Sequence, residues 1–232
     1  IRETNARALV DAVRAHGRFA TIETLWRASQ CGAPTVRRLA LADAFGSMRL
    51  TRQQALWQVR ALRDAAAPVL DAATEQGATL FDMRPQPLPT VPLPQQVALD
   101  YSSVGLSLKA HPVHSTRTML ERRGAILCAD LVRDGAVESG DDATVAGLVL
   151  CRQRPATASG VVFITLEDES GSANLIVRPK VWERYRPVAR HATMLLATGR
   201  VERRSGVTHL LVRRLVDLSS ATPVGAGSRD FH

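Results

Sequence analysis

The chain has 232 residues, of which 45% are hydrophobic and 22% are charged, and its formal net charge is +8 at pH 7. This length allows one large or two modest domains, each with its own core. No run approaches the roughly 18 apolar residues that a membrane-spanning helix needs, and residues 1–18 lack the apolar region of a signal peptide. These features exclude a membrane protein and predict a cytoplasmic one.

The cysteines and histidines give no pattern of a metal site. Cys31, Cys128 and Cys151 are scattered and form no C-x-x-C pair, which favours buried hydrophobic roles in a reducing compartment over disulfides or zinc. His111 and His114 are three residues apart, but the sequence places no cysteine or carboxylate to complete their site. We expect no metal in this chain.

The positive charge lies at both ends of the chain. Residues 1–94 carry a net +4, residues 95–143 a net −2, and residues 144–232 a net +6. This distribution is typical of two nucleic-acid-facing modules joined by a connector. Only Lys109 and Lys180 are lysines, so the excess of arginine has two explanations: phosphate recognition by the bidentate guanidinium, or the base composition of the genome.

The first third of the sequence has the pattern of four short helices. Apolar residues recur at helical spacing over residues 4–15, Thr21 and Thr51 are N-cap residues, and Pro34 suits the first turn of a helix that runs to Phe45. The fourth helix is expected to bury four side chains: Leu56, Trp57, Val59 and Leu62. Turns at Gly17 and Gly46 favour a tandem helix-hairpin-helix unit, which presents backbone N–H groups to one phosphate strand. Each turn holds a single glycine, so an ordinary helical bundle fits the pattern nearly as well.

Prolines then mark a connector. Five of them in residues 84–94 predict an extended, stiff segment, followed by two short helices at residues 95–101 and 112–122.

The last third predicts a five-stranded oligonucleotide-binding (OB) barrel with one helical insertion. The expected strands cover residues 144–152, 160–167, 173–178, 192–203 and 207–216, and a short helix covers residues 179–186. The predicted class is therefore α+β multidomain, with a helix-hairpin-helix domain at residues 1–80, a connector at 81–143, the OB barrel at 144–218 and a flexible tail at 219–232.

Several segments carry a family likeness that covers nearly the whole chain. They are Leu41–Gly46 with Arg52–Trp57, Gly105–Pro112, Gly147–Pro155, Val162–Glu169 with Gly171 and Asn174, and Ser228–His232. Together they resemble the C-terminal part of the bacterial error-prone DNA polymerase, the translesion relative of the DNA polymerase III alpha subunit.

The resemblance implies a DNA-binding segment that acts in damage-induced synthesis. In that family the palm, with its metal-binding aspartates and magnesium, precedes this region, so the chain alone is expected to be inactive and to need no cofactor. The acidic candidates Asp141-Asp142 and Glu167–Glu169 fall in predicted turns, and we expect no catalytic residue. The implied partners are single-stranded or primer-template DNA, with translesion accessory proteins and a sliding clamp as further candidates.

The candidate DNA contacts are arginines at strand ends and turn residues between helices. On the second strand, alternation places Val162, Ile164 and Leu166 in the barrel and Phe163 outside it, where it could stack on a base; a core or interdomain role for Phe163 fits equally well. The barrel candidates are Arg152, Arg154, Phe163, Arg178, Arg200, Arg203 and Arg204. The helical candidates are Gly17, Arg18, Gly46, Arg49 and Arg52. The alternative function is a docking module for other translesion or replication factors, and an independent enzyme is the least favoured.

Overall fold

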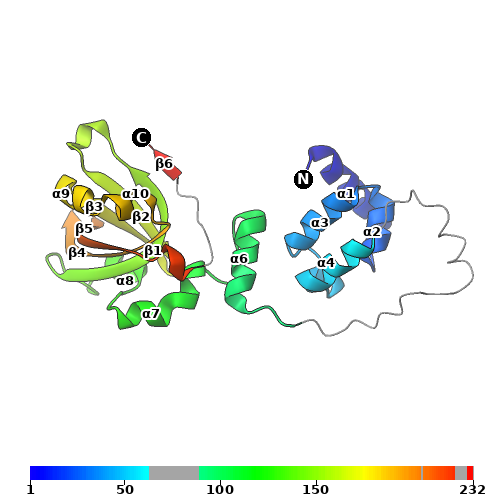
Figure 1. The fold of residues 1–232 in the computed structure, drawn as a ribbon, viewed down its shortest axis with the longest axis horizontal. Coiled ribbons are helices and arrows are strands. Elements are labelled where there is room, and N and C mark those ends of the chain that lie inside the picture. The colour runs from blue at the N-terminus through cyan, green and yellow to red at the C-terminus, as the bar shows by residue number, and fades with distance from the viewer. Residues whose placement is uncertain (63–88, 205, 223–228, 232) are drawn as a thin grey trace, which may run out of the picture. The chain divides into compact units, whose positions relative to one another are not determined.

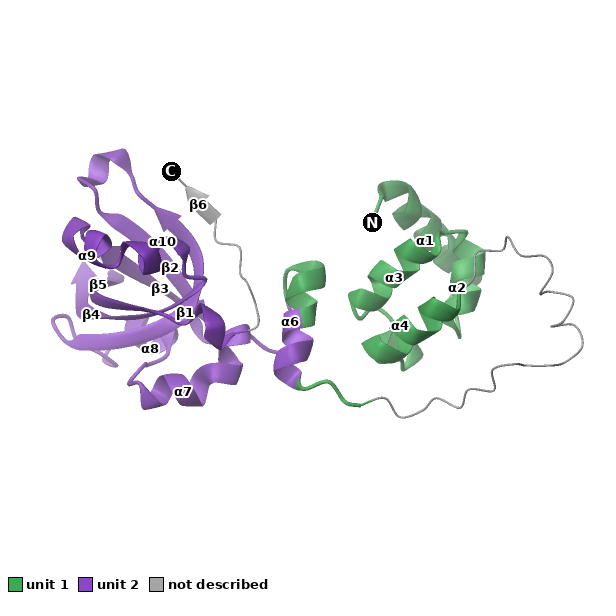
Figure 2. Ribbon diagram, in the orientation of Figure 1, with its two compact units in different colours: residues 1–92, 99–106 green, residues 93–98, 107–232 purple. Residues whose placement is uncertain are grey.

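The structure is a computed structural model that describes residues 1–62, 89–204, 206–222 and 229–231, the last three by their backbone alone. It divides into two compact units, shown in Figure 2. Unit 1 comprises Ile1–Pro92 and Leu99–Leu106, and unit 2 comprises Leu93–Ala98 and Ser107–His232. Residues 84–88 of the proline-rich segment 84–94 lie outside the described residues.

Unit 1 contains the four predicted helices. They are α1 (Glu3–His16), α2 (Ile22–Ser29), α3 (Ala33–Leu41) and α4 (Arg52–Ala61), with a 3-10 turn η1 (Gly46–Met48) before α4. Thr21 and Thr51 each form a capping box, in which the cap side chain accepts from the backbone of the third helical residue. Pro34 lies in the first turn of α3, where its missing N–H is of no consequence.

The core of unit 1 is small and confirms most of the predicted stripes. Its buried members are Ile22, Leu25, Val36, Ala40, Phe45, Ala55 and Val59. The prediction for Trp57 is wrong, since its exposure is 51%. The stripe of α4 runs instead through Arg52, Ala55 and Val59, because residues at i, i+3 and i+7 share one face.

Short helices precede the barrel. They are α6 (Leu93–Val104), η2 (Pro112–Thr116), α7 (Arg117–Arg122) and α8 (Cys128–Val132). Cys128 and Leu131 of α8 are fully buried in the main core of unit 2. The prediction of helices near residues 95–101 and 112–122 is confirmed, with α6 longer than expected.

The OB barrel is confirmed in unit 2 (Figure 1). Its strands are β1 (Asp142–Gln153), β2 (Val162–Asp168), β3 (Gly171–Val177), β4 (Met194–Arg204) and β5 (Val207–Asp217). They follow the order β2-β3-β5-β4-β1, and β1 also pairs with β2, which closes the barrel. The β3–β5 pair is parallel, whereas the β1–β2, β2–β3, β4–β5 and β1–β4 pairs are antiparallel.

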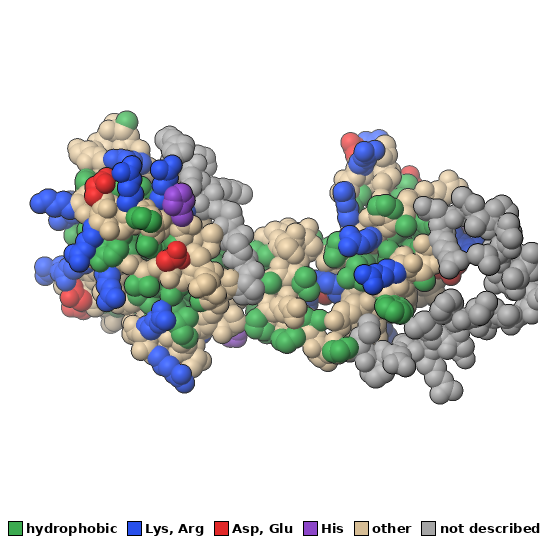
Figure 3. Space-filling model, in the orientation of Figure 1, with side chains coloured by type: hydrophobic (Ala, Val, Ile, Leu, Met, Phe, Trp, Pro, Cys, Tyr) green, Lys and Arg blue, Asp and Glu red, His purple; other side chains and the backbone are tan. Residues whose placement is uncertain are grey.

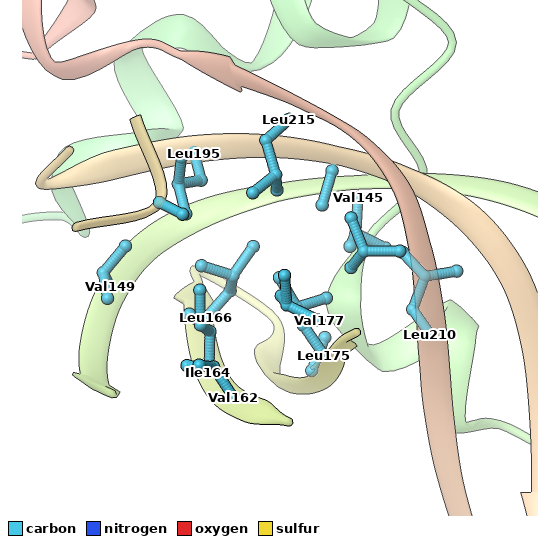
Figure 4. Close-up of a cluster of buried hydrophobic side chains, with 14 of the residues drawn as sticks. Val145, Val149, Val162, Ile164, Leu166, Leu175, Val177, Leu195, Leu210 and Leu215 are labelled. Carbon is cyan, nitrogen blue, oxygen red and sulfur yellow. The ribbon is translucent and has the colours of Figure 1, made fainter. Parts of the chain in front are cut away.

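Alternate side chains of these strands fill the barrel. On β2, Val162, Ile164 and Leu166 are buried, as predicted from alternation. They meet side chains from the other strands, including Val145, Leu175, Leu195 and Leu210 (Figure 4). The barrel interior is therefore packed with side chains.

Two glycines allow the strands to bend tightly. A Cβ on Gly147 would lie 2.5 Å from the carbonyl oxygen of Glu167, and a Cβ on Gly199 would collide with the backbone of Leu211. Gly199 also follows the bulge between β4 and β5. Only glycine tolerates such close backbone approach, which strand coiling in a small barrel requires.

The helical insertion and the tail both depart from the prediction. The insertion forms two helices, α9 (Pro179–Arg184) and α10 (Arg186–His191), in place of one. The tail that the sequence predicts to be flexible contains a 3-10 turn η4 (Ser219–Ala221) and a short strand β6 (Arg229–Phe231). β6 pairs in parallel with residues 151–153 of β1, and it can do so because the pairing of β4 with β1 ends at Leu148 and leaves that edge open.

Across the described ranges, no helix combines the length and apolar character that spanning a bilayer requires.

Candidate nucleic-acid interface

One row of apolar side chains crosses the outside of the barrel. Phe163 on β2 pairs with Ile176 on β3, and Ile176 pairs with Leu211 on β5. Each is half-buried and lies between two buried neighbours along its own strand, so all three point outward. Directly paired residues share a face of the sheet, and the three side chains therefore form one continuous apolar row.

Polar residues extend and border this row. Gln153 pairs with Phe163 at one end, Arg200 pairs with Leu211 at the other, and both are exposed. The neighbouring outward row holds Thr165, Asn174 and His209, in which the Thr165 hydroxyl donates to Asn174 Oδ1 at 3.2 Å. The outer surface of β2, β3 and β5 thus combines apolar area with hydrogen-bonding groups. We call the row of Phe163, Ile176 and Leu211 the apolar row.

Four of the predicted barrel arginines are exposed around this surface. Arg178 lies two residues beyond Ile176, and Arg154 follows Gln153 directly. Arg204 is 83% exposed and lies 3.9 Å from Glu202. Arg200 is exposed and donates Nε–H to the Gly140 carbonyl at 2.8 Å. These four guanidinium groups stay candidates for phosphate contact.

Arg152 does not fit its predicted role, because only 7% of the residue is exposed. Its guanidinium donates to the carbonyls of Ala189, at 2.7 Å, and Ala192. These carbonyls belong to the last turn of α10, where intrahelical donors are missing. Arg152 therefore attaches α10 to β1.

Arg203 likewise bonds within the protein. Its side chain is 22% exposed and contacts Asp134 at 2.9 Å. It also donates to the carbonyls of Leu131, Val132, Arg133 and Val137. A guanidinium with this many acceptors holds the segment between α8 and β1 in place, and this arrangement does not fit the predicted phosphate contact of Arg203.

The helical candidates divide in the same way. Gly17, Arg18, Gly46 and Arg49 are exposed in turns, and Gly17 has a φ of 73° that favours glycine. Arg52 is buried, forms an ion pair with Asp100 and lies 4.0 Å from Asp43. The prediction that Arg52 contacts phosphate does not fit this burial.

The acidic residues predicted to lie in a turn instead begin within β2, which ends at Asp168, and Asp168 and Glu169 form a largely buried ionic cluster with Arg117. Arg117 donates Nε–H to Glu169 at 2.7 Å and a second N–H to Asp168 at 2.9 Å. Asp168 is fully buried as a side chain and also accepts from the amides of Cys128, Ser170 and Gly171. We call Arg117, Asp168 and Glu169 the ionic cluster. It attaches the segment before β1 to the β2–β3 turn.

This cluster changes the pKa values of its members. Burial favours the neutral form of Asp168, but hydrogen bonds from Ser170 and Cys128 and the charge of Arg117 outweigh it and lower the carboxyl pKa. Burial acts on Glu169 in the same way, and the hydrogen bond from Arg117 outweighs it, so its pKa is also lowered. Burial also raises the pKa of the Cys128 thiol.

His111 has a carboxylate neighbour that the sequence did not indicate. Its Nε2 lies 3.8 Å from Glu167 Oε2. Burial lowers the pKa of His111 even though Glu167 opposes the shift. Among the described residues, no group of three or more histidine, cysteine or acidic side chains is arranged to hold a metal ion.

A group of cations on α9 and α10 was not among the predicted contacts. Lys180, Arg184, Arg186 and Arg190 are all exposed, and Figure 3 shows Lys and Arg side chains gathered near these helices. The i, i+4 spacing of 180 with 184 and of 186 with 190 is a signal that could have shown them on a shared face.

Comparisons with known proteins bear on the barrel and on the chain as a whole. Residues 143–218 match the tRNA_anti-codon family model, described as an OB-fold nucleic acid binding domain. An error-prone DNA polymerase 2 of Agrobacterium fabrum is 41% identical over 96% of this chain and 21% of its own length. An error-prone DNA polymerase of Rhodopseudomonas palustris is 40% identical over 92% of this chain and 18% of its own length.

The chain is thus homologous to a small region of error-prone DNA polymerases, and it spans about a fifth of the length of these relatives. An asparaginyl-tRNA synthetase structure from Pyrococcus horikoshii, complexed with asparaginyl-adenylate, aligns with 40% of this chain and 22% of its own at 19% identity, with a TM-score of 0.34.

Proposed function

We propose that this chain is the DNA-binding region of an error-prone DNA polymerase that acts in translesion synthesis in the cytoplasm. In this proposal the OB barrel holds single-stranded template DNA across β2, β3 and β5, and chemistry takes place in a part of the polymerase outside these 232 residues. The observation that carries the proposal is the apolar row beside exposed arginines.

The chemistry of the row suits single-stranded DNA. Bases offer flat apolar faces that stack on an aromatic ring such as Phe163, and Ile176 and Leu211 extend that apolar surface. Arg178 and Arg200 lie beyond Ile176 and Leu211, where they could neutralise phosphates. Aromatic residues make up only 4% of the chain, so we expect moderate affinity with strong salt dependence.

The helical unit has a supporting role in the proposal. The exposed turns at Gly17 and Gly46, with Arg18 and Arg49, support a helix-hairpin-helix grip on the backbone of duplex DNA. A sliding clamp and translesion accessory proteins are further proposed partners of the whole polymerase.

Fluorescence anisotropy with labelled oligothymidylate tests the barrel site. Phe163→Ala is expected to weaken binding by about 1–3 kcal/mol, the usual contribution of stacking on one base. Because Phe163 is only half-buried, the fold should survive, which circular dichroism checks. The matched control is Phe19→Ala, a half-buried phenylalanine packed on the core of unit 1.

Equal loss of affinity in both variants, or binding by the wild type that does not weaken with salt, would contradict the proposal. If Phe163→Ala instead keeps DNA affinity and loses pull-down of polymerase accessory proteins, the docking alternative is favoured.

A further inference from the structure

We propose that α9 and α10 form a second DNA-binding site, at which no base stacks. It binds the phosphate backbone of the single-stranded DNA where that DNA extends beyond the apolar row. The site consists of Lys180, Arg184 and Arg190, and we call it the basic ridge. The proposal rests on the proposed function, because it extends the path of the same DNA strand.

The two helices are built to expose cations. Trp182 and Ala189 are buried in the barrel core, and Val181, Tyr185 and Val188 pack against it. With those positions facing inward, Lys180, Arg184 and Arg190 are left exposed. The apolar residues fix the orientation of both helices, so the cations are held on a rigid part of the unit.

Charge on this surface is poorly neutralised. Glu183 is the single acidic residue in the sequence of α9 and α10, and it lies 3.7 Å from Arg186. No carboxylate in the described part of the chain forms an ion pair with Lys180, Arg184 or Arg190. Like charges at i, i+4, such as Lys180 with Arg184, repel each other and destabilise a helix. An anion bound between them would remove this penalty.

The basic ridge is continuous with the apolar row. Asn174, Ile176 and Arg178 alternate outward along β3, and α9 starts at the next residue, Pro179. On the neighbouring side, the Cβ position of Gly160 is 3.5 Å from Pro179 Cγ and 3.6 Å from a guanidinium nitrogen of Arg154. A DNA strand with a base stacked on Phe163 can therefore continue past Arg178 and Arg154 onto α9.

The residue types indicate backbone contact without base reading. Trp182 of α9 is buried, and Tyr185, which lies between α9 and α10, is half-buried with the Arg184 guanidinium over its ring at 5.5 Å from the centroid. Lysine and arginine on a convex helix surface contact phosphates and carry no sequence information. The ligand class is the phosphodiester backbone of single-stranded DNA.

Two oligothymidylates of different length distinguish binding at the basic ridge from binding at the apolar row. One OB fold covers roughly 4 to 16 nucleotides, so an oligomer of about 5 nucleotides should fill the row alone and one of about 16 should also reach the ridge. The test variant is Lys180→Gln/Arg184→Gln/Arg190→Gln in the full chain. The control is Arg122→Gln/Arg123→Gln/Arg214→Gln, which removes the same charge from exposed positions elsewhere in unit 2.

Anisotropy is measured across a salt series. For the long oligomer, the ridge variant should lower the slope of log K against log salt by about 2, since each phosphate contact to a single strand contributes roughly 0.7. The affinity of the ridge variant for the short oligomer should stay within about twofold of that of the control variant.

The proposal is overturned if the ridge variant and the control give the same slope with the long oligomer, or if the ridge variant weakens both oligomers equally. Failure of the wild type to bind the short oligomer at low salt would instead contradict the proposed function of the row. Thermal melting of both variants confirms that the fold is intact.

Discussion

The ionic cluster and the basic ridge use the same charged residue types in opposite ways. In the ionic cluster, Arg117 is 13% exposed and contacts two carboxylates, one of them fully buried. On the basic ridge, Lys180, Arg184 and Arg190 are exposed. Burial with partners makes a charge structural, because its removal leaves other buried groups unsatisfied. Exposure without a carboxylate partner leaves a charge available to a ligand.

The difference shows that the number of arginines in this chain is a poor guide to DNA contacts. Arg52, Arg152 and Arg203 were all predicted to contact phosphate, yet each has acceptors within the protein. Arg154, Arg178 and Arg204 are exposed. Substitutions of arginines from each group would show which ones contribute to stability and which ones contribute to DNA binding.

The largest expected effect is on stability, from Arg117→Met. Without Arg117, the carboxylates of Asp168 and Glu169 remain beside each other in a largely buried site. Breaking a buried pair in this way costs about 3–5 kcal/mol, measured as the free energy of unfolding in urea. The control is Arg133→Met, whose exposed pair with Asp130 should contribute less than about 1 kcal/mol. Equal losses in the two variants would refute a structural role for the cluster.

Arg152→Met should give the next largest loss. The substitution fills the space of the side chain but leaves the carbonyls of Ala189 and Ala192 without their charged donor. Hydrogen bonds to charged groups contribute about 1.5–3 kcal/mol, and urea unfolding measures the change. At a temperature where the variant is folded, its DNA affinity should equal that of the wild type. A variant with normal stability and weakened DNA binding would restore Arg152 to the interface.

Acid should destabilise unit 2 through the ionic cluster and His111. The pKa values of Asp168, Glu169 and His111 are all lowered in the folded state. The unfolded chain therefore binds more protons than the folded chain as the pH falls, and the free energy of unfolding decreases.

The loss should begin below about pH 6.5, the ordinary pKa of histidine, and continue below the ordinary carboxyl values near 4. Urea titrations at several pH values measure it. His111→Gln should remove the first part of the decrease and keep the second. Stability that rises from neutral to acid pH would be incompatible with these shifts.

Local patterns were sufficient to predict most elements of the fold. Capping residues such as Thr21 and Thr51 act within one turn, and alternation along β2 is decided by the neighbours of each residue. The partners of Arg152 are 37 and 40 residues away in sequence, and those of Arg117 are 51 and 52 residues away. No local pattern reports such contacts, so the sequence could not show that Arg52, Arg152 and Arg203 have partners within the protein.

The apolar row is a second feature that local sequence patterns predict only in part. The outward position of Phe163 follows from alternation, but its alignment with Leu211 depends on a parallel β3–β5 pairing between segments 35 residues apart. The chain between β3 and β5 contains α9, α10 and β4, so this alignment is set by long-range pairing and not by a local pattern.

The smallest expected effect belongs to a single exposed cation, Arg178→Gln. Since Arg178 is exposed at the end of β3, stability should change by no more than about 0.5 kcal/mol. Binding of oligothymidylate should lose one phosphate contact, which lowers the salt slope by about 0.7. Arg122→Gln is the control, because Arg122 is an exposed arginine at the end of α7. If Arg178→Gln and Arg152→Met both changed the salt slope and not the stability, burial would not separate the two kinds of arginine in this chain.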